Sequence, residues 1–397
     1  MRIETGRGEI TLWALLGIWS VSALTSLPGL AISPILGDLS SIFKHATEFD
    51  IQMLTSLPSL LIIPFILLAG WLSDNIGYVR LLYFGLSVFL ISGLLYFFCE
   101  TIGELIVVSL LLGVGAGVIT PLSTSLITRF FVGEKRTRQF GYSSAINNLS
   151  LVAATAVTGY LAEIQWRLPF LVYMLPIVSL FLVNNIKRAE KDAAAVGENN
   201  IAESALPSSG INYHSLVKLM MYYFLITFLV MVISVNLPFL FSEYGYSTGT
   251  AGVVISLFFL FIMIPGLFIN KILAVLKGRE FVFCLLLISV GLSIIFFERR
   301  LSLIILGVLL AGVGYGIAQP CVYDRTATVA SADKATYAMA LVMTMNYVAI
   351  VVCPSVVDFF QDLSGIKSER FAFAFNSCFG IIATIILFLI QVSKLRK

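Results

Sequence analysis

The stretch that decides the fold is Gly113-Val-Gly-Ala-Gly117-Val-Ile-Thr-Pro121, because it returns 199 residues later as Gly312-Val-Gly-Tyr-Gly316-Ile-Ala-Gln-Pro320. The spacing is half of the 397-residue chain. The same offset relates Asn147 to Asn346. The chain is therefore built from two repeats, each carrying the same glycine-rich helix. Two parallel repeats of this kind are the layout of a secondary transporter that rocks around a central site.

The repeated glycines and prolines sit inside long apolar runs, with no strand before them. A nucleotide-binding loop is therefore excluded. Small residues let helix backbones approach closely in lipid, and a proline removes one backbone hydrogen bond and can kink the helix. The candidates for helix packing and kinking are Gly113, Gly117, Pro121, Gly312, Gly316 and Pro320.

The composition is that of a polytopic membrane protein. Hydrophobic residues make up 59% of the chain and charged residues only 12%, whereas a soluble domain is about one quarter charged. The mean hydropathy is +0.98. Soluble enzymes, nucleic-acid binders and secreted disulfide scaffolds are excluded. The five cysteines lie in or beside apolar stretches and form no CxxC pair, and the two histidines are far apart, so we expect no metal site and no cofactor.

The apolar runs predict an all-α protein with twelve membrane-spanning helices, since each span needs about 20 residues. The first run is too long for a cleaved signal peptide and has no small-residue cleavage site. A polar stretch in the middle of the chain predicts a flexible linker over 187–214, between six-helix bundles at 1–186 and 215–397. We place the spans near 11–36, 50–73, 80–99, 103–130, 140–162, 168–186, 216–242, 248–270, 280–297, 301–327, 335–357 and 371–393.

The basic residues orient the chain. With the N-terminus placed in the cytoplasm, 19 of the 25 lysines and arginines fall in cytoplasmic segments and 6 in outer ones. This split follows the positive-inside rule and predicts that both termini are cytoplasmic. We expect a multi-pass protein of a bacterial inner membrane.

A polar loop follows the second predicted span and reads Gly70-Trp-Leu-Ser-Asp74-Asn-Ile-Gly77-Tyr-Val-Arg80. It resembles the signature loop of the major facilitator superfamily, G-x-L-a-D-r-x-G-r-r. The second half holds an eroded copy, in which Asn270 stands where Asp74 stands. Together with the repeat and the linker, the resemblance covers the whole chain. It implies the twelve-helix major facilitator fold and transport by alternating access.

Within the superfamily the chain looks most like the drug:proton antiporters and their metabolite-exporter relatives. Leu27-Pro28 in the first span and Trp166-Arg167 before the sixth are similar to that branch. Two positions depart from it. Ser109 stands where an arginine is usual, and Ala154-Thr155 stands where a Gly-Pro pair is usual.

The loop motif predicts a cytoplasmic gate formed by Gly70, Asp74, Gly77 and Arg80. An Asp74 carboxylate at this helix end can pair with Arg80 or Arg129, or face the positive start of the eleventh span. The resemblance implies that this gate closes the cytoplasmic side when the outer side is open.

Few ionisable side chains fall inside the predicted spans, where they are costly and are functional candidates. The resemblance implies that the first, fourth, seventh and tenth spans line the cavity. Asp324 lies in the tenth span and is the only carboxylate well inside one of these spans, so it is our candidate for proton coupling. Uncharged polar residues of the spans are candidates for the substrate cavity, with helix–helix hydrogen bonds as the alternative role. They are Thr25, Ser123, Asn147, Asn236, Tyr315, Gln319, Tyr323 and Asn346.

The leading hypothesis is a secondary active transporter that exports a small amphipathic organic solute, coupled to protons. The alternative is an importer or facilitator of a small metabolite, because the rocking cycle is reversible. An intramembrane enzyme or a receptor is a different class, and the chain has no HExxH, no GxSxG and no histidine pair. We expect a monomer whose partners are the solute, protons and the lipid bilayer, and no nucleic acid.

The gate hypothesis predicts that Asp74→Asn keeps expression and membrane insertion but weakens cytoplasmic closure, since the carboxylate loses its charge. Cysteines placed in the cavity should become more accessible to a thiol reagent added from the cytoplasmic side, and transport should fall. Unchanged accessibility together with full transport would remove Asp74 from the mechanism.

Overall fold

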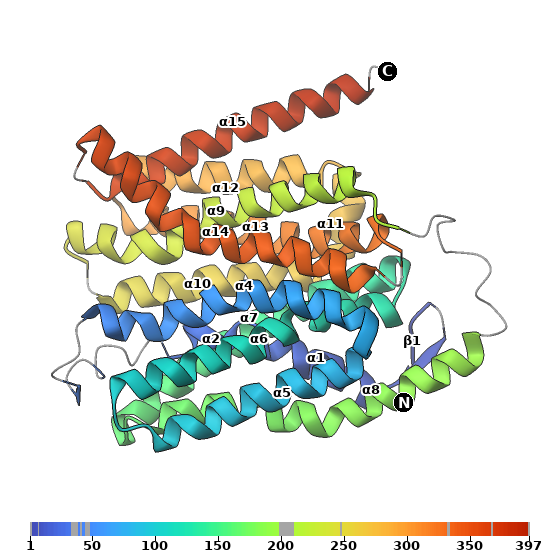
Figure 1. The fold of residues 1–397 in the computed structure, drawn as a ribbon. Helices are drawn as coiled ribbons and strands as arrows, with labels where there is room; N and C mark the ends of the chain where they lie inside the picture. The colour runs from blue at the N-terminus through green and yellow to red at the C-terminus, as the bar shows by residue number, and fades with distance from the viewer. Residues whose placement is uncertain are drawn as a thin grey trace.

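The computed structural model describes residues 2–6, 8–32, 39, 42–43, 48–197, 210–246, 248–331, 334–366 and 368–395. Long helices lie side by side in one bundle (Figure 1). The N-terminal half of the chain, in blue to green, forms one side of the bundle, and the C-terminal half, in yellow to red, forms the other. The start of the chain at 2–6, the described segments on either side of 198–209 and the end of the last helix at 395 lie at one end of the bundle (Figure 1). We call this the terminal end and the opposite one the distal end.

The chain forms helices because lipid offers no partner for backbone N–H and C=O groups, and a helix satisfies them internally. The helices are α1 (Leu12–Leu24), α2 (Leu27–Leu30), α4 (Glu48–Ile76), α5 (Tyr78–Leu95), α6 (Ile102–Phe130), α7 (Gly133–Ile164), α8 (Pro176–Gly197), α9 (Tyr213–Glu243), α10 (Thr248–Leu267), α11 (Ile269–Leu276), α12 (Glu280–Phe297), α13 (Leu301–Val329), α14 (Ala335–Ser364) and α15 (Arg370–Leu395), with 3-10 turns η2 (Tyr96–Phe98) and η3 (Leu168–Met174).

Ten helices in the described part of the chain are long and apolar enough to cross a membrane, and Leu12–Leu24 and Leu57–Ser73 are shorter apolar helices at the first two predicted spans. The protein is therefore an all-α, multi-pass membrane protein, and twelve crossings remain a prediction. Helix ends differ from the predicted ones. α7 begins at Gly133, earlier than residue 140, and α8 continues to Gly197, into the predicted linker. Residues 198–209 of that linker lie outside the described residues.

The first predicted span is not one continuous helix. α1 ends at Leu24, and a short second helix, α2, begins at Leu27. Pro28 has no N–H to donate to the carbonyl of Leu24, so the helical ladder is interrupted there. The Thr25 hydroxyl instead donates to the Ser22 carbonyl at 2.9 Å. Residues 33–38, which complete the predicted span, lie outside the described residues.

The repeated glycines lie where helices cross within each half. A Cβ added at Gly113 would come within 2.7 Å of the Pro58 carbonyl oxygen of α4, and one at Gly117 within 2.9 Å of the Ile62 carbonyl oxygen. In the second half, Gly312 and Gly316 approach α10 in the same way, at 3.0 and 2.3 Å from backbone oxygens. Both α6 and α13 continue through their prolines, Pro121 and Pro320.

The two halves touch through a second pair of crossings, related by the repeat. A Cβ at Gly266 of α10 would lie 2.4 Å from the Gly141 carbonyl oxygen of α7, and a Cβ at Gly70 of α4 would lie 2.5 Å from the Ala340 Cβ of α14. Gly141 and Ala340 occupy equivalent positions of the two repeats. Backbones this close leave no room for water or for a side chain at the contact. Both crossings lie towards the terminal end.

Two short backbone pairings, which the sequence did not predict, attach the segment before the first helix of each half to a later loop of the same half. Strand β1 (Arg2–Glu4) forms a hairpin with β2 (Glu9–Thr11), and the Val132 N–H, before α7, donates to the Thr5 carbonyl at 3.2 Å. In the second half the Ser331 N–H, before α14, donates to the Gly210 carbonyl at 3.1 Å. We call these two pairings the straps. The side chains of Lys135 and Glu4 add an ion pair to the first strap, and this lysine lowers the pKa of Glu4.

The crossing of α7 and α10 predicts that Gly266→Leu destabilises the protein. The added side chain overlaps the Gly141 backbone, and overpacking of this kind costs about 1–3 kcal/mol. Thermal unfolding of the purified variant should occur several degrees below that of the wild type. Gly252→Leu is the matched control on the same helix, because nothing lies within 4 Å of a Cβ there. Equal melting temperatures for the two variants would contradict the close contact.

Candidate functional site

The predicted gate motif lies at the terminal end, where α4 turns into α5. Gly70 of the motif contacts α14. Gly77 has φ +88° and precedes the first residue of α5, a backbone conformation that favours glycine. Arg80 is exposed. The Asp74 side chain lies outside the described residues, so its predicted pairing with Arg80 or Arg129 stays a prediction.

Arg129 lies beside this motif, at the end of α6. Its guanidinium carbon is 4.3 Å from the centre of the Tyr78 ring, the residue directly after Gly77. A cation over an aromatic face at this distance is an attractive contact. Arg129 is therefore packed against the motif from the end of α6.

The second-half copy of the motif contacts the N-terminal half directly. Gly266 packs on Gly141, and the Asn270 side-chain amide donates to the Glu134 carbonyl, in the first turn of α7, at 3.0 Å. Asn270 stands where Asp74 stands in the first copy. One motif therefore meets the start of α7, and the other meets the start of α14.

Asp324 lies at the interface between the halves. Its Oδ1 accepts a hydrogen bond from Nε of Arg136, in the first turns of α7, at 2.8 Å. The side chains are 21% and 14% exposed, so the pair is largely shielded from water. Sequence reasoning missed Arg136 because the predicted span begins at residue 140, which left this arginine in a loop. Asp324 is thus one half of an ion pair across the interface.

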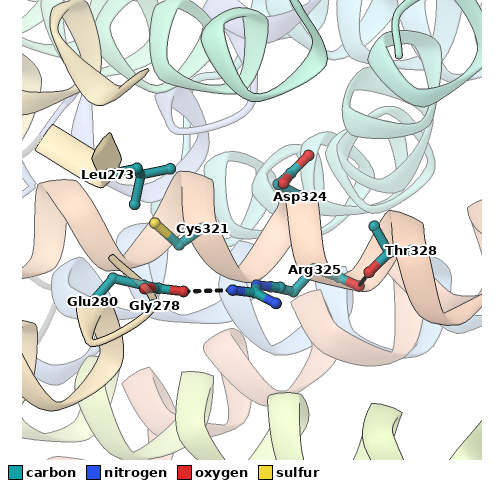
Figure 2. Close-up of a pocket in the computed structure, with 7 residues that line it drawn as sticks. All are labelled: Leu273, Gly278, Glu280, Cys321, Asp324, Arg325 and Thr328. Carbon is teal, nitrogen blue, oxygen red and sulfur yellow. Dashed lines mark hydrogen bonds and ion pairs between the residues drawn. The ribbon is translucent and has the colours of Figure 1, made fainter. Parts of the chain in front are cut away.

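The neighbouring Arg325 faces another direction. It binds Glu280 at the start of α12, with 2.7 Å between Nη2 and Oε1. Figure 2 shows Asp324 and Arg325 leaving α13 on different sides, as the angle of about 100° between successive helix residues requires. Between them opens a cavity of about 260 Å³, lined by Leu273, Gly278, Glu280, Cys321, Asp324, Arg325 and Thr328 (Figure 2).

Four of the predicted cavity residues belong to one hydrogen-bonded group in the C-terminal half. Tyr315, Gln319 and Tyr323 lie on one face of α13, turned towards α9. The Gln319 amide donates to the hydroxyls of Tyr223 and Tyr323 at 3.1 and 3.3 Å, and these hydroxyls are 2.8 Å apart. The Tyr315 hydroxyl donates to Oδ1 of Asn346 on α14 at 3.0 Å. Every member is uncharged.

The N-terminal half holds a similar group. The Ser123 hydroxyl lies 3.0 Å from that of Ser22, which accepts from Ser143 at 2.8 Å. Asn147 donates to the Ser26 hydroxyl at 2.8 Å. The repeat-matched Asn346 also pairs with a hydroxyl of its own half but as the acceptor, since the Thr227 hydroxyl of α9 donates to its Oδ1 at 2.9 Å. Thr25 bonds only to its own helix among the hydrogen bonds of the described residues.

A hydrogen bond joins the two halves beside these groups. The Ser144 hydroxyl of α7 donates to Oε1 of Gln319 at 2.7 Å, and the Phe140 ring one turn away lies 5.8 Å from the Tyr323 ring. Sequence reasoning missed Ser143, Ser144, Tyr223 and Thr227. The signal was present for the serines, which lie one helical turn before Asn147 and therefore share its side of the helix.

Asn236 does not join this central site. It lies near the distal end of α9 and is 7% exposed. Nothing in the described part of the chain resembles a metal centre, because no three His, Cys, Asp or Glu side chains there are grouped closely enough to hold an ion.

Comparison with known proteins agrees with this geometry. The sequence matches the Major Facilitator Superfamily profile over residues 14–354 and again over 219–396. Multidrug resistance protein 3 of Bacillus subtilis is 28% identical over 180 residues, which are 44% of this chain and 33% of that protein. Quinolone resistance protein NorA of Staphylococcus aureus is 27% identical over 151 residues, 36% of this chain and 38% of NorA. The matches thus span about a third of these curated relatives, and the relatives agree with the branch to which the sequence motifs pointed.

Solved structures show the same fold. The human organic anion transporter MFSD10 superposes with a TM-score of 0.71 at 19% identity, over 95% of this chain and 97% of MFSD10. The proton:xylose symporter XylE superposes with a TM-score of 0.70 at 13% identity, over 95% of this chain and 94% of XylE. Since the profile match, the repeat and the helix arrangement all agree, the chain belongs to the Major Facilitator Superfamily.

Proposed function

We propose that this transporter exports a small amphipathic organic solute by alternating access, and that proton movement drives the export. We further propose that both termini face the cytoplasm of a bacterial cell, so that the terminal end is the cytoplasmic end. The 19 to 6 distribution of basic residues supports this orientation. In this orientation the conformation described here is closed towards the cytoplasm.

The observation that carries the proposal is the uncharged polar layer between the halves. It consists of tyrosine, glutamine, asparagine and serine side chains, and the bond between Ser144 and Gln319 links it across the interface. Amide and hydroxyl groups both donate and accept, while the aromatic rings offer apolar faces. Such a surface suits a solute with an apolar body and a few polar groups, and it holds no charge that would select a small polyanion.

The same layer suits a protein that must open and close. A neutral hydrogen bond contributes about 0.5–1.5 kcal/mol net, because water replaces the lost partner. Breaking the Ser144–Gln319 bond therefore leaves two groups that either water or a solute can satisfy. Both closed and open arrangements are then close in free energy, as a reversible cycle requires.

For proton coupling we propose Asp324, now with a specific partner. Arg136 holds the Asp324 carboxylate across the interface at 2.8 Å. A protonated Asp324 has no charge to offer Arg136, so proton binding weakens this ion pair and favours opening at the terminal end. In this proposal the charge of the Asp324 carboxylate sets the strength of the contact between the halves.

Gln319→Leu should weaken solute binding, because the variant keeps a similar volume but loses the amide that contacts Ser144, Tyr223 and Tyr323. We expect about a tenfold lower affinity for an amphipathic dye such as ethidium, equivalent to about 1.4 kcal/mol. The measurement is dye binding and uptake in proteoliposomes. Gln165→Leu, at an exposed position at the distal end, is the control. Dye uptake by the wild type no faster than by empty liposomes would contradict transport of this solute class.

Asp324→Asn should abolish dye accumulation driven by a pH difference while equilibrative dye exchange continues, because the Arg136 contact no longer responds to protons. Asp362→Asn, an exposed carboxylate on α14, should transport like the wild type. If Asp324→Asn still concentrates the dye under the same pH difference, the coupling role is wrong. The sign of the pH difference that drives accumulation decides between export and import.

A further inference from the structure

The distal end of the C-terminal half contains a buried polar atom that the transport site does not use. Asn236 is 7% exposed, and its side-chain oxygen Oδ1 has no hydrogen-bond partner among the described residues. Buried polar groups are almost always paired, so an unpaired acceptor at this position needs an explanation. The oxygen requires a donor that the arrangement described here does not provide.

The group that faces Asn236 is the carboxyl group of Glu369, in the turn that precedes α15. The Asn236 side-chain NH2 group lies close enough to this carboxyl group to lower its pKa. A carboxylate only accepts hydrogen bonds, so it pairs with the Asn236 NH2 group and leaves Oδ1 without a donor. A carboxylic acid has one O–H to donate as well as a carbonyl oxygen. It pairs with both ends of a carboxamide at once, and the two groups then satisfy each other completely.

The turn that carries Glu369 is held in place by Glu243, the last residue of α9. The Glu243 carboxylate accepts from the Ser368 hydroxyl at 2.9 and 3.2 Å and from the Glu369 N–H at 2.9 Å. These bonds place the Glu243 carboxylate at the start of α15, close to Glu369. They also connect the turn to the same helix that carries Asn236.

The charges around Glu369 favour its neutral form. Partial burial raises the pKa of Glu369, and the carboxylates of Glu243 and Asp358 raise it further, while the Asn236 hydrogen bond acts in the opposite direction. Two arginines among the described residues of this end contact Tyr244. The guanidinium groups of Arg299 and Arg370 lie 5.7 and 5.2 Å from the centre of the Tyr244 ring, and Nε of Arg370 donates to the Tyr244 hydroxyl.

We propose that Glu369 and Asn236 form a proton-binding site at the distal end of the transporter, separate from Asp324. Hydronium in the adjoining solution gives one proton to a Glu369 carboxylate oxygen and leaves as water, and no other bond changes. The new O–H donates to Oδ1 of Asn236. α9 also carries Tyr223 and Thr227, which belong to the central hydrogen-bonded group, so protonation acts on the helix that lines the solute site.

The link to solute movement rests on the proposed transport function, but proton binding itself does not. The first test is therefore infrared spectroscopy of the purified protein in lipid, titrated with acid and base without any solute. The wild type should show a carboxylic-acid carbonyl band that disappears above the ordinary titration range of glutamate. Glu369→Gln should lack this band, and Glu100→Gln, which changes an exposed acid at the same end, should keep it.

Thermal unfolding provides the second readout, and the raised pKa of Glu369 determines how the melting temperature should change with pH. Because the pKa of Glu369 is raised in the folded protein, its stabilising effect is complete below the ordinary glutamate pKa and is lost as pH rises through the folded-state value. The side-chain amide introduced by Glu369→Gln bonds Asn236 as the acid does. This variant should therefore match the wild type at acidic pH and melt a few degrees higher at neutral pH.

Two results would overturn the site. One is a wild-type infrared band that Glu369→Gln leaves unchanged, and the other is a variant whose melting temperature follows that of the wild type at every pH. Neither measurement requires transport. A titrating band in a protein that transports no dye would contradict only the proposed function. Intact dye transport without a titrating band would contradict only this proton-binding site.

Discussion

Direct backbone contact between helices is the constraint on which the rest of this structure depends. Lipid tails are as apolar as leucine, so helices in a membrane gain little by hiding apolar side chains from them, and close packing must hold the bundle together. Glycine allows that packing at the crossings within each half and at the crossing of α7 with α10. Because Gly141 and Gly266 set how deeply α7 and α10 sit against each other, they also set the separation between Ser144 and Gln319 and between Arg136 and Asp324.

Much of the fold follows from patterns that are local in the sequence. Apolar runs of membrane length predict helices, and the repeat that begins at Gly113 and Gly312 predicts two related halves. The polar stripe on α13 is equally local, because residues four apart lie on one face of a helix. It could therefore be predicted that Tyr315, Gln319 and Tyr323 share one face of the helix. It could also be predicted that Asp324 and Arg325 point in different directions.

The partners of these residues were not readable, since they lie far away in the chain. Arg136 is 188 residues from Asp324, and Ser144 is 175 residues from Gln319. Many serines and arginines compete for such roles in the sequence, and only the depth and rotation of each helix select among them. The break between α1 and α2 was not predicted for another reason. Hydropathy does not register that Pro28 lacks an N–H, so an uninterrupted apolar run predicts one continuous helix.

The straps carry a consequence for how the chain assembles. Thr5 leaves the ribosome early, but Val132, its partner, is made only after helices α1 to α6. The first strap can therefore close as soon as the first four predicted spans of that half exist, before the last two are made. Gly210 and Ser331 impose the same order on the second half. Each half can thus close on itself before it is complete, which would favour pairing of helices within one repeat over pairing with their counterparts in the other.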